Sequence, residues 1–223
     1  SQDLLETKAQ QPLLNQSQKT QSQIHKQHRR WWCIEVDGVI VPTQVDGGTE
    51  WREVKNAVIY PMHCPSQRHY VSQLGEKDGF TPLVHGLLRV AGVAGVKPQD
   101  RLIGISDGAS WIAELMGDLG VWRHVLDVYH AAQYLETLLV GMGWSDDSRL
   151  STRRSLLRGQ LDLQAWLNHH APDPNTLSEG GQKALAYLQK QTLLGHTAYP
   201  HFKADGIEVI GSGQIEGANK HVI

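Results

Sequence analysis

The residues Arg101-Leu-Ile-Gly-Ile-Ser-Asp-Gly108 are the clearest indicator of fold class in this sequence. The first six are mainly apolar and few in number, which is typical of a short buried strand. They deliver Asp107 and Gly108 to the C-terminal end of that strand. Helical spacing then marks the apolar residues that follow, Ile112, Leu115, Met116 and Leu119. The stretch therefore predicts a strand, an acid and a helix in that order.

The same order recurs a little further along, in His124-Val-Leu-Asp-Val-Tyr-His130. A short strand is followed by Asp127 and His130 and then by a helix. Its apolar stripe has the spacing i, i+3, i+4, i+7 and i+8, at Ala131, Tyr134, Leu135, Leu138 and Leu139. Strands that alternate with helices indicate an α/β organisation.

Upstream of this pattern, two β-rich runs predict an antiparallel hairpin. The first is Trp31-Trp-Cys-Ile-Glu-Val-Asp-Gly-Val-Ile-Val41, and the second spans residues 51–60. Side chains alternate along a strand, so Glu35 and Asp37 share one face of the first run. We expect a helix after this hairpin, capped by Thr81 and with Pro82 in its first turn.

The remaining segments differ in character. Residues 142–205 lack strand patterns and predict only helices, whereas residues 206–211 approach a Gly-Ser-Gly bend and a last helix that carries Glu216. Residues 1–30 hold eight Gln and few apolar residues, which is typical of a linker or the frayed tail of a helix. The absence of an initial Met suggests a fragment of a longer protein.

Composition excludes several classes of protein. No apolar run approaches the ~20 residues that a membrane-spanning helix needs. The net charge of −2 divides into +3 for residues 1–30 and −5 for the rest. A mildly acidic body does not suit nucleic-acid binding through a basic surface alone, but it suits a catalytic module whose acids hold cations. The only two cysteines, Cys33 and Cys64, form no zinc or disulfide pattern.

Three acids lie in comparable settings: Asp37 in the first strand, Asp107 at the end of a later one, and Glu216 on the last helix. Ligands bind at the carboxyl ends of strands in α/β sheets, so the three side chains are candidates to converge there. Converging carboxylates bind Mg²⁺ or Mn²⁺. Simpler interpretations remain open, because Asp-Gly is a common turn pair and an acid in a first helical turn favours the helix dipole.

Five motifs in sequence order resemble the catalytic domain of DDE transposases of bacterial insertion sequences, most closely the ISKra type, whose layout is related to Mutator-like transposases. The resemblance covers residues 31–223. The motifs are Val36-Asp-Gly-Val-Ile-Val-Pro42, Trp51-Arg-Glu-Val-Lys55, Ser106-Asp-Gly-Ala-Ser-Trp111, Leu126-Asp-Val-Tyr-His130 and Ile210-Gly-Ser-Gly-Gln-Ile-Glu216.

The resemblance implies an α/β, RNase H-like mixed sheet flanked by helices, with an all-α insertion before the last catalytic helix. It implies that Asp37, Asp107 and Glu216 are the catalytic, metal-binding triad, with two Mg²⁺ or Mn²⁺ ions. Asp127 and His130 match an auxiliary Asp-x-x-His pair, which orients DNA or the active site, or merely packs the sheet edge. Glu35 is a further acid on the face of Asp37.

The implied domains are a tail at 1–30, the first part of the catalytic domain at 31–141, the helical insertion at 142–205, and the domain's end with a truncated helix at 206–223. The implied function is metal-dependent phosphodiester hydrolysis followed by DNA strand transfer. The implied partners are transposon terminal inverted repeats and target DNA, bound by a homodimer or higher oligomer, without a membrane, in the bacterial cytoplasm at the nucleoid. Two alternatives are an RNase H-like nuclease or resolvase that does not join, and an inactive remnant that binds DNA.

Overall fold

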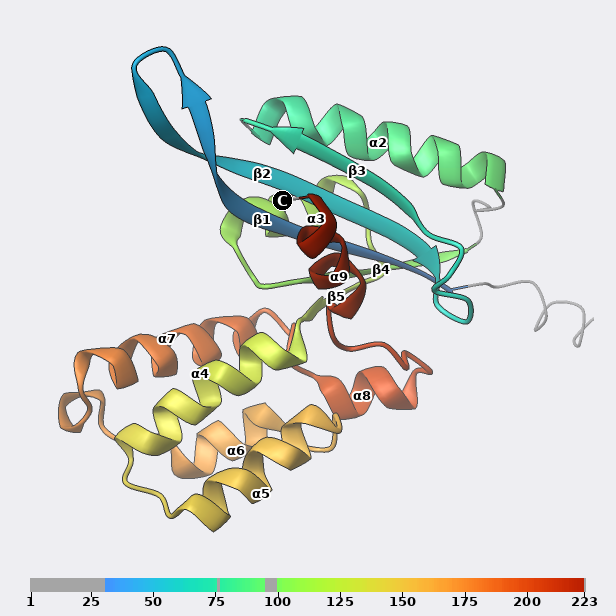
Figure 1. Cartoon of the computed structure of the whole chain (residues 1–223). Coiled ribbons are helices and arrows are strands. Elements are labelled where there is room, and N and C mark those ends of the chain that lie inside the picture. Colours follow the sequence, from blue (N-terminus) through green and yellow to red (C-terminus); the bar gives the residue numbers. More distant parts are fainter. Residues whose placement is uncertain (1–30, 76, 95–99, 223) are drawn as a thin grey trace, which may run out of the picture.

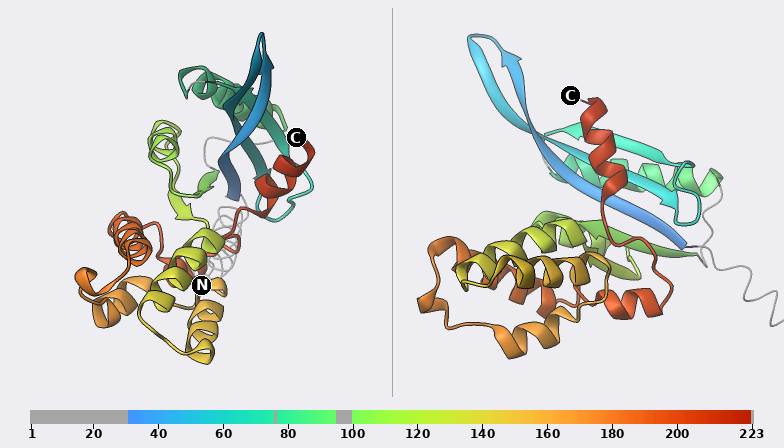
Figure 2. Two further views of the ribbon diagram at one scale, coloured as in Figure 1. Left: turned by 60° about the vertical axis from the view of Figure 1, so that its left-hand side comes forward. Right: turned by 60° about the horizontal axis from the view of Figure 1, so that its bottom comes forward.

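A mixed sheet separates two groups of helices (Figures 1 and 2). The structure is a computed structural model and describes residues 31–75, 77–94 and 100–222. One face of the sheet packs against α2 (Lys77–Ala94) and α3 (Ser110–Asp118), and the other faces a helical body and the last helix, α9 (Gly213–Val222). The sheet is thus buried between layers, as α/β architecture requires.

The strands are β1 (Trp31–Val45), β2 (Gly48–Pro61), β3 (His69–Leu74), β4 (Arg101–Ser106) and β5 (Arg123–Leu126). The helical body consists of α4 (Val128–Gly141), α5 (Asp146–Leu157), α6 (Leu163–His170), the short 3₁₀ helix η1 (Pro174–Thr176), α7 (Glu179–Leu193) and α8 (Tyr199–Ala204).

Within the described residues the sheet has five strands in the order β3-β2-β1-β4-β5. The first three strands pair antiparallel, and β4 and β5 run parallel to β1. β4 pairs only with the first part of β1, over residues 31–36, and β3 pairs with residues 54–59 of β2. The rest of the β1–β2 hairpin therefore extends beyond the sheet as a two-stranded arm (Figure 1).

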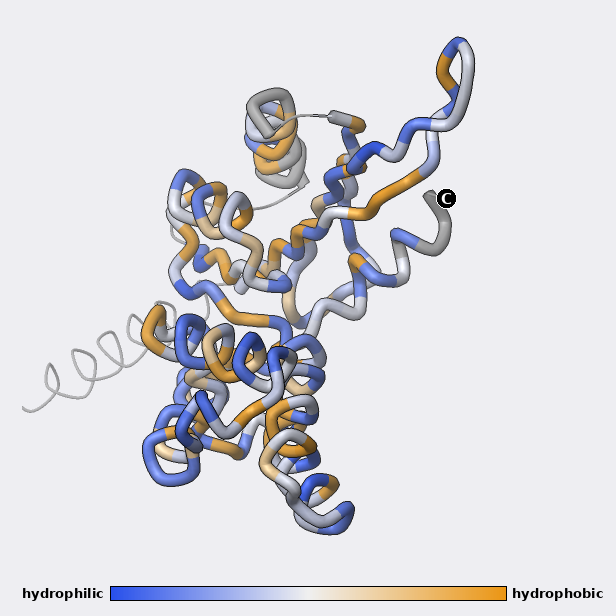
Figure 3. Tube along the Cα trace, turned by 90° about the vertical axis from the view of Figure 1, so that its left-hand side faces the viewer, coloured by the Kyte–Doolittle hydropathy of each residue, from blue (hydrophilic) through white to orange (hydrophobic). Residues whose placement is uncertain are grey.

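Alternate residues of β1 feed two hydrophobic cores. Trp32, Ile34 and Val36 pack with residues of α2 and α3, whereas Cys33 packs on the opposite face with the helical body. Figure 3 shows apolar residues recurring along the strands and helices. Glu35 breaks this pattern, because it is a fully buried acid in a strand that is otherwise apolar over residues 31–36.

The expected α/β class is confirmed: a mixed sheet is flanked by helices, with only helices between α4 and α9 in the described residues. The hairpin and the strand at 101–106 are also confirmed. The start of the first long helix was predicted wrongly, since α2 begins at Lys77 and contains Pro82. β3 was missed. The domain boundaries stay predictions, and the tail at 1–30 lies outside the described residues.

None of the helices in the described part of the chain is both long and apolar enough to cross a membrane.

Candidate active site

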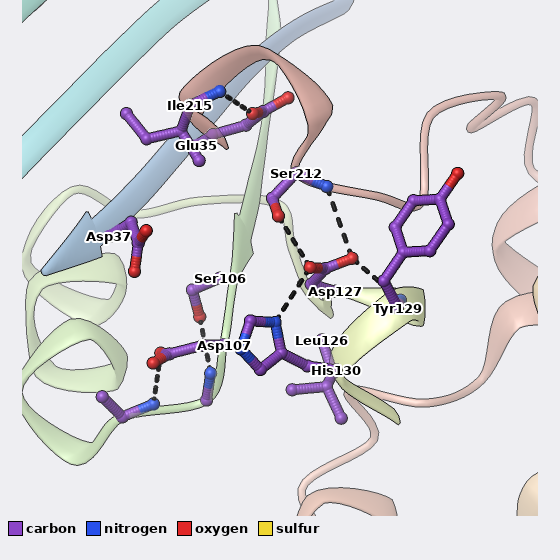
Figure 4. A network of polar contacts seen from close by, with 12 residues as sticks. Glu35, Asp37, Ser106, Asp107, Leu126, Asp127, Tyr129, His130, Ser212 and Ile215 are labelled. Atoms are coloured by element: carbon purple, nitrogen blue, oxygen red, sulfur yellow. Dashed lines mark hydrogen bonds and ion pairs between the residues drawn. The ribbon is translucent and has the colours of Figure 1, made fainter. Parts of the chain in front are cut away.

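Asp37 and Asp107 lie on neighbouring parallel strands. The register of β1 and β4 pairs Glu35 with Ile105 and Val36 with Ser106, so the next step brings Asp37 level with Asp107. Asp37 shares the face of Glu35 that is turned toward the helical body, and Figure 4 shows both aspartates beside the C-terminal end of β4. The sheet therefore brings together two of the three predicted catalytic acids.

The carboxylate of Asp37 is partly buried and held from two sides. It accepts a 2.8 Å hydrogen bond from the backbone N–H of Gly38 and one of 2.7 Å from the Asn219 amide. Burial is the main cause that raises the pKa of Asp37, and the nearby charge of Asp107 raises it further. Two acids that disfavour each other's charge form a place where a cation is stabilised.

The Asp107 side chain folds back onto its own turn. Its Oδ1 accepts a 2.9 Å hydrogen bond from the Ala109 N–H, just before α3 begins. The following residue, Gly108, has a φ of +82°, in the region that favours glycine. The hydrogen bond and the backbone conformation are both local features. The Asp-Gly pair therefore forms a structural turn that also places a carboxylate at the end of β4.

Asp127 and His130 form a hydrogen-bonded pair at the start of α4. Asp127 is the N-cap of this helix and accepts from the Tyr129 N–H at 3.0 Å and from His130 Nδ1 at 3.0 Å. It also accepts from Ser212, whose hydroxyl donates at 2.7 Å and whose backbone N–H donates at 3.4 Å. Burial works to raise the pKa of Asp127, yet the hydrogen bonds from His130 and Ser212 outweigh it and leave the pKa below its usual value.

His130 faces three acids. The hydrogen bond to Asp127 is the main cause that raises its pKa, and the charges of Asp107 and Asp37 add to this effect. In Figure 4 the ring lies between Asp127 and Asp107. The pair therefore lies near the two aspartates.

The last helix is docked against the sheet by polar contacts on one side. Asn219 donates to Asp37 and accepts a 2.8 Å hydrogen bond from Asn56 of β2. Glu216 lies three residues earlier in the helix, so it neighbours Asn219 on the helix surface. Its side chain is exposed and makes no hydrogen bond or ion pair with the residues that the structure describes. The structure therefore brings Asn219, rather than Glu216, into contact with Asp37.

Glu35 anchors the first turn of this helix. One carboxylate oxygen accepts a 2.8 Å hydrogen bond from the Ile215 N–H, and the other accepts from the Tyr60 hydroxyl. Burial raises the pKa of Glu35 to about 7 even though these hydrogen bonds oppose the shift. With both oxygens occupied inside the protein, Glu35 holds α9 in place instead of offering a ligand.

Across residues 31–75, 77–94 and 100–222, no three His, Cys, Asp or Glu side chains lie close enough to hold a metal ion together. Asp37 and Asp107 supply the hard oxygen donors that Mg²⁺ and Mn²⁺ prefer, and their mutual repulsion is what a cation relieves. The pair therefore fits a divalent cation. Glu216 lies one helical turn before Asn219, which contacts Asp37, and its own side chain is exposed.

Comparisons with known proteins add little. Neither a protein-family model nor a curated protein matches the sequence. Among solved structures, one similar chain is the Mos1 mariner protein in the crystal structure of its paired end complex with Mn, at 15% sequence identity and a TM-score of 0.28. The match covers 73% of this chain and 55% of that chain, so this chain spans about half the length of its solved neighbour. At these values the likeness supports no statement about activity.

Sequence reasoning missed the contacts that reach these acids from α7 and α9. Asn219 has a sequence signature, because it lies four residues after the buried Ile215 and so on the same face of the helix. Tyr187 and Gln191 have none. They contact the Asp107–Gly108 turn from 80 and 83 positions away, and only the fold brings them there.

Proposed function

We propose that this chain is the catalytic domain of a DDE-type transposase, which cuts DNA at the ends of an insertion sequence and joins the freed ends to a target. The observation that carries the proposal is the Asp37–Asp107 pair. Two carboxylates lie level on parallel strands, and the charge of one disfavours the charge of the other. This arrangement is costly unless a cation binds between them.

Asp37, Asp107 and Glu216 are the proposed ligands of Mg²⁺ or Mn²⁺, with two ions as the expected number. When bound, such ions activate the attacking oxygen and stabilise the leaving oxygen of a phosphodiester displacement. The chain's contribution is to hold the oxygen donors in place. Asn219 and the Gly38 N–H orient Asp37, and the local turn orients Asp107. Glu216 is carried by the same helix as Asn219, three residues earlier.

Asp127 and His130 are the proposed auxiliary residues. Because the hydrogen bond to Asp127 raises the pKa of His130, the protonated imidazole is favoured beside the two aspartates. A cation at this position attracts the phosphate of a DNA backbone and holds it near the metal ligands. The ring is only partly buried, with 39% of its side chain exposed, so DNA has access to it.

Around this centre we propose the domain division 31–141, 142–205 and 206–223, with the middle segment as a helical insertion. The proposed partners are terminal inverted repeats, target DNA and further copies of the chain in a synaptic complex. The proposed place of action is the bacterial cytoplasm, at the nucleoid.

The test uses the 223-residue chain with labelled DNA that carries the ends of the element. We expect cleavage that requires Mg²⁺ or Mn²⁺ and that is lost in Asp37→Ala, Asp107→Ala and Glu216→Ala, while circular dichroism shows each variant folded. A matched control is Glu179→Ala, an exposed acid on α7 in the helical body. Full cleavage by any one of the three variants would remove that residue from the triad.

A second arm separates joining from cutting. Pre-cut DNA with a free 3′-hydroxyl is incubated with the chain, metal and a target plasmid, and joined products are measured. A transposase yields joined products. Cleavage without joining would support the nuclease or resolvase alternative, and DNA binding without either reaction would support the inactive remnant.

A further inference from the structure

The turn that presents Asp107 is held from α7. The Tyr187 hydroxyl donates to the backbone oxygen of Asp107, and Gln191 Nε2 donates to the backbone oxygen of Gly108 at 3.1 Å. Gln191 is 1% exposed. Two consecutive carbonyl groups beside the carboxylate are therefore bound by one helix, which begins more than 70 positions later in the chain.

The opposite side of the same turn is also bound. The Gly108 N–H donates to Ser106 Oγ at 3.2 Å, and Ser106 Oγ lies 2.8 Å from His124 Nε2. The His124 ring packs on the His196 ring with 4.1 Å between centroids. Burial, together with His196, lowers the pKa of His124 to about 3, so His124 is neutral and shares a hydrogen bond with the Ser106 hydroxyl through Nε2.

A last hydrogen bond closes the circle. His196 Nδ1 lies 2.8 Å from Gln191 Oε1, and because an amide oxygen can only accept, the Nδ1–H of His196 donates to Gln191. The polar groups thus run from the Gly108 N–H through two histidines to the Gly108 carbonyl. We call the set Ser106, His124, Gln191 and His196 the turn ring. Both backbone groups of Gly108 are fixed by it.

The space around Gly108 shows how tightly the turn is enclosed. A Cβ at this position would lie 2.6 Å from Gln191 Nε2 and 2.9 Å from Tyr187 Oη. Such separations are well inside van der Waals contact, and the positive φ already favours glycine. The α7 side chains are therefore fitted to a bare backbone, and the turn has little freedom to move.

We propose that Tyr187 and Gln191 are positioning residues for Asp107, so that the helical body is a working part of the metal site. The proposal rests on the proposed function for the role of Asp107 as a ligand. Neither residue touches the metal or the DNA; both act through the backbone of the turn. Residues that orient a ligand in this way typically contribute about 10- to 100-fold to metal affinity.

The experiment is Mn²⁺ titration of the full chain by calorimetry, well below the melting temperature of each variant. Tyr187→Phe removes only the hydroxyl, because the ring that stacks on Tyr134 at 3.9 Å is kept. Gln191→Met keeps the length of the side chain and removes both polar groups. Gln189→Met is the matched control, an exposed residue on the same helix. Asp107→Ala reports on the proposed function itself.

We expect Tyr187→Phe and Gln191→Met to weaken Mn²⁺ binding about tenfold or more. Gln189→Met should bind as the unchanged chain does, and Asp107→Ala should not bind. High Mn²⁺ should restore DNA cleavage to the Tyr187 and Gln191 variants but not to Asp107→Ala. A purely structural role would leave metal dependence unchanged.

If Asp107→Ala abolishes binding while both α7 variants bind normally, the positioning role is wrong and the proposed function stands. If Asp107→Ala binds Mn²⁺ normally, the proposed function fails, and amide hydrogen exchange of residues 106–110 decides the rest. Faster exchange there in Gln191→Met, without faster exchange in Gln189→Met, would support control of the turn by α7. Equal exchange in the two would overturn it.

Discussion

The backbone N–H of Ile215 donates a 2.8 Å hydrogen bond to the carboxylate of Glu35, and 180 positions separate the two residues. Ile215 lies in the first turn of α9, and Glu35 lies in the middle of β1. The same strand carries Asp37 and the same helix carries Glu216. This buried contact therefore helps to fix the position of α9, which carries Glu216, against β1, which carries Asp37.

Replacing Glu35 tests this contact. We expect Glu35→Ala to lower the free energy of unfolding by about 2–4 kcal/mol, because the Tyr60 hydroxyl and the Ile215 N–H are left buried without acceptors. Glu35→Gln keeps an acceptor and should lose clearly less. Urea denaturation measures both. Equal losses in the two variants would show that the lost volume matters and the hydrogen bond does not.

The enclosure of Gly108 gives a second prediction. Gly108→Ala should destabilise the protein by about 2–4 kcal/mol, since it combines a positive φ with overlap against Gln191 and Tyr187. Gly47 is the matched control, because it has a φ of +98° and nothing within 4 Å of a new Cβ. Gly47→Ala should cost about 1 kcal/mol, the strain alone. Thermal denaturation compares them, and equal losses would contradict the enclosure.

The neutral state of His124 predicts a loss of stability in acid. Its pKa is about 3 in the folded protein and near 6.5 when unfolded, so below pH 6.5 the unfolded chain binds a proton that the folded one does not. Stability should fall as the pH drops from 6.5 toward 3, by up to about 1.4 kcal/mol per pH unit from this residue. Other groups add their own dependence on pH.

The share of His124 is isolated by His124→Asn. The free energy of unfolding is measured by urea denaturation at several pH values for both proteins. The difference between them should change steadily between pH 6.5 and pH 4, with the unchanged protein losing more. Parallel curves would mean that His124 is protonated in the folded protein.

Asp127 and His130 give a prediction that NMR can follow. The hydrogen bond to Asp127 is the main reason why the pKa of His130 is raised, so Asp127→Asn should lower it. Ser212→Ala should have a smaller effect on His130, because the Ser212 hydroxyl donates to Asp127 and acts on His130 only through it. Titration of the His130 ring resonances measures both. An unchanged pKa of His130 in Asp127→Asn would mean that the charges of Asp37 and Asp107 raise this pKa instead.

Much of the fold was readable from local patterns. The apolar run that ends at Asp107 predicted β4 at the residues where it is found, and the spacing after Asp127 predicted α4. β3 was missed because its six residues alternate only weakly between apolar and polar types. None of these six residues is fully buried, so the strand lacks the apolar run of a core strand. The start of α2 was misplaced because Pro82 was interpreted as a residue of the first helical turn, whereas α2 already begins at Lys77.

The candidate site was readable only in part. Ligands bind at the carboxyl ends of neighbouring strands in an α/β sheet, so Asp37 and Asp107 could be expected close together. The contacts of Glu35 and Gln191 could not, since they depend on how α9 and α7 dock on the sheet. A single acid inside the apolar run Trp31-Trp-Cys-Ile-Glu-Val36 was nevertheless a visible anomaly in the sequence. Glu35 is needed there because its carboxylate accepts a hydrogen bond from the first turn of α9.

The docking of α9 on β1 also fixes an order of events during synthesis. β5 ends at Leu126, and α9 begins 87 positions later at Gly213. Domains fold as the chain leaves the ribosome, N-terminal parts first. The strands that carry Asp37 and Asp107 are therefore made well before the segment that contacts Glu35. A chain interrupted anywhere in this interval has both aspartates and no means of bringing up Glu216, so the proposed set of three acids exists only once α9 has been translated and docked.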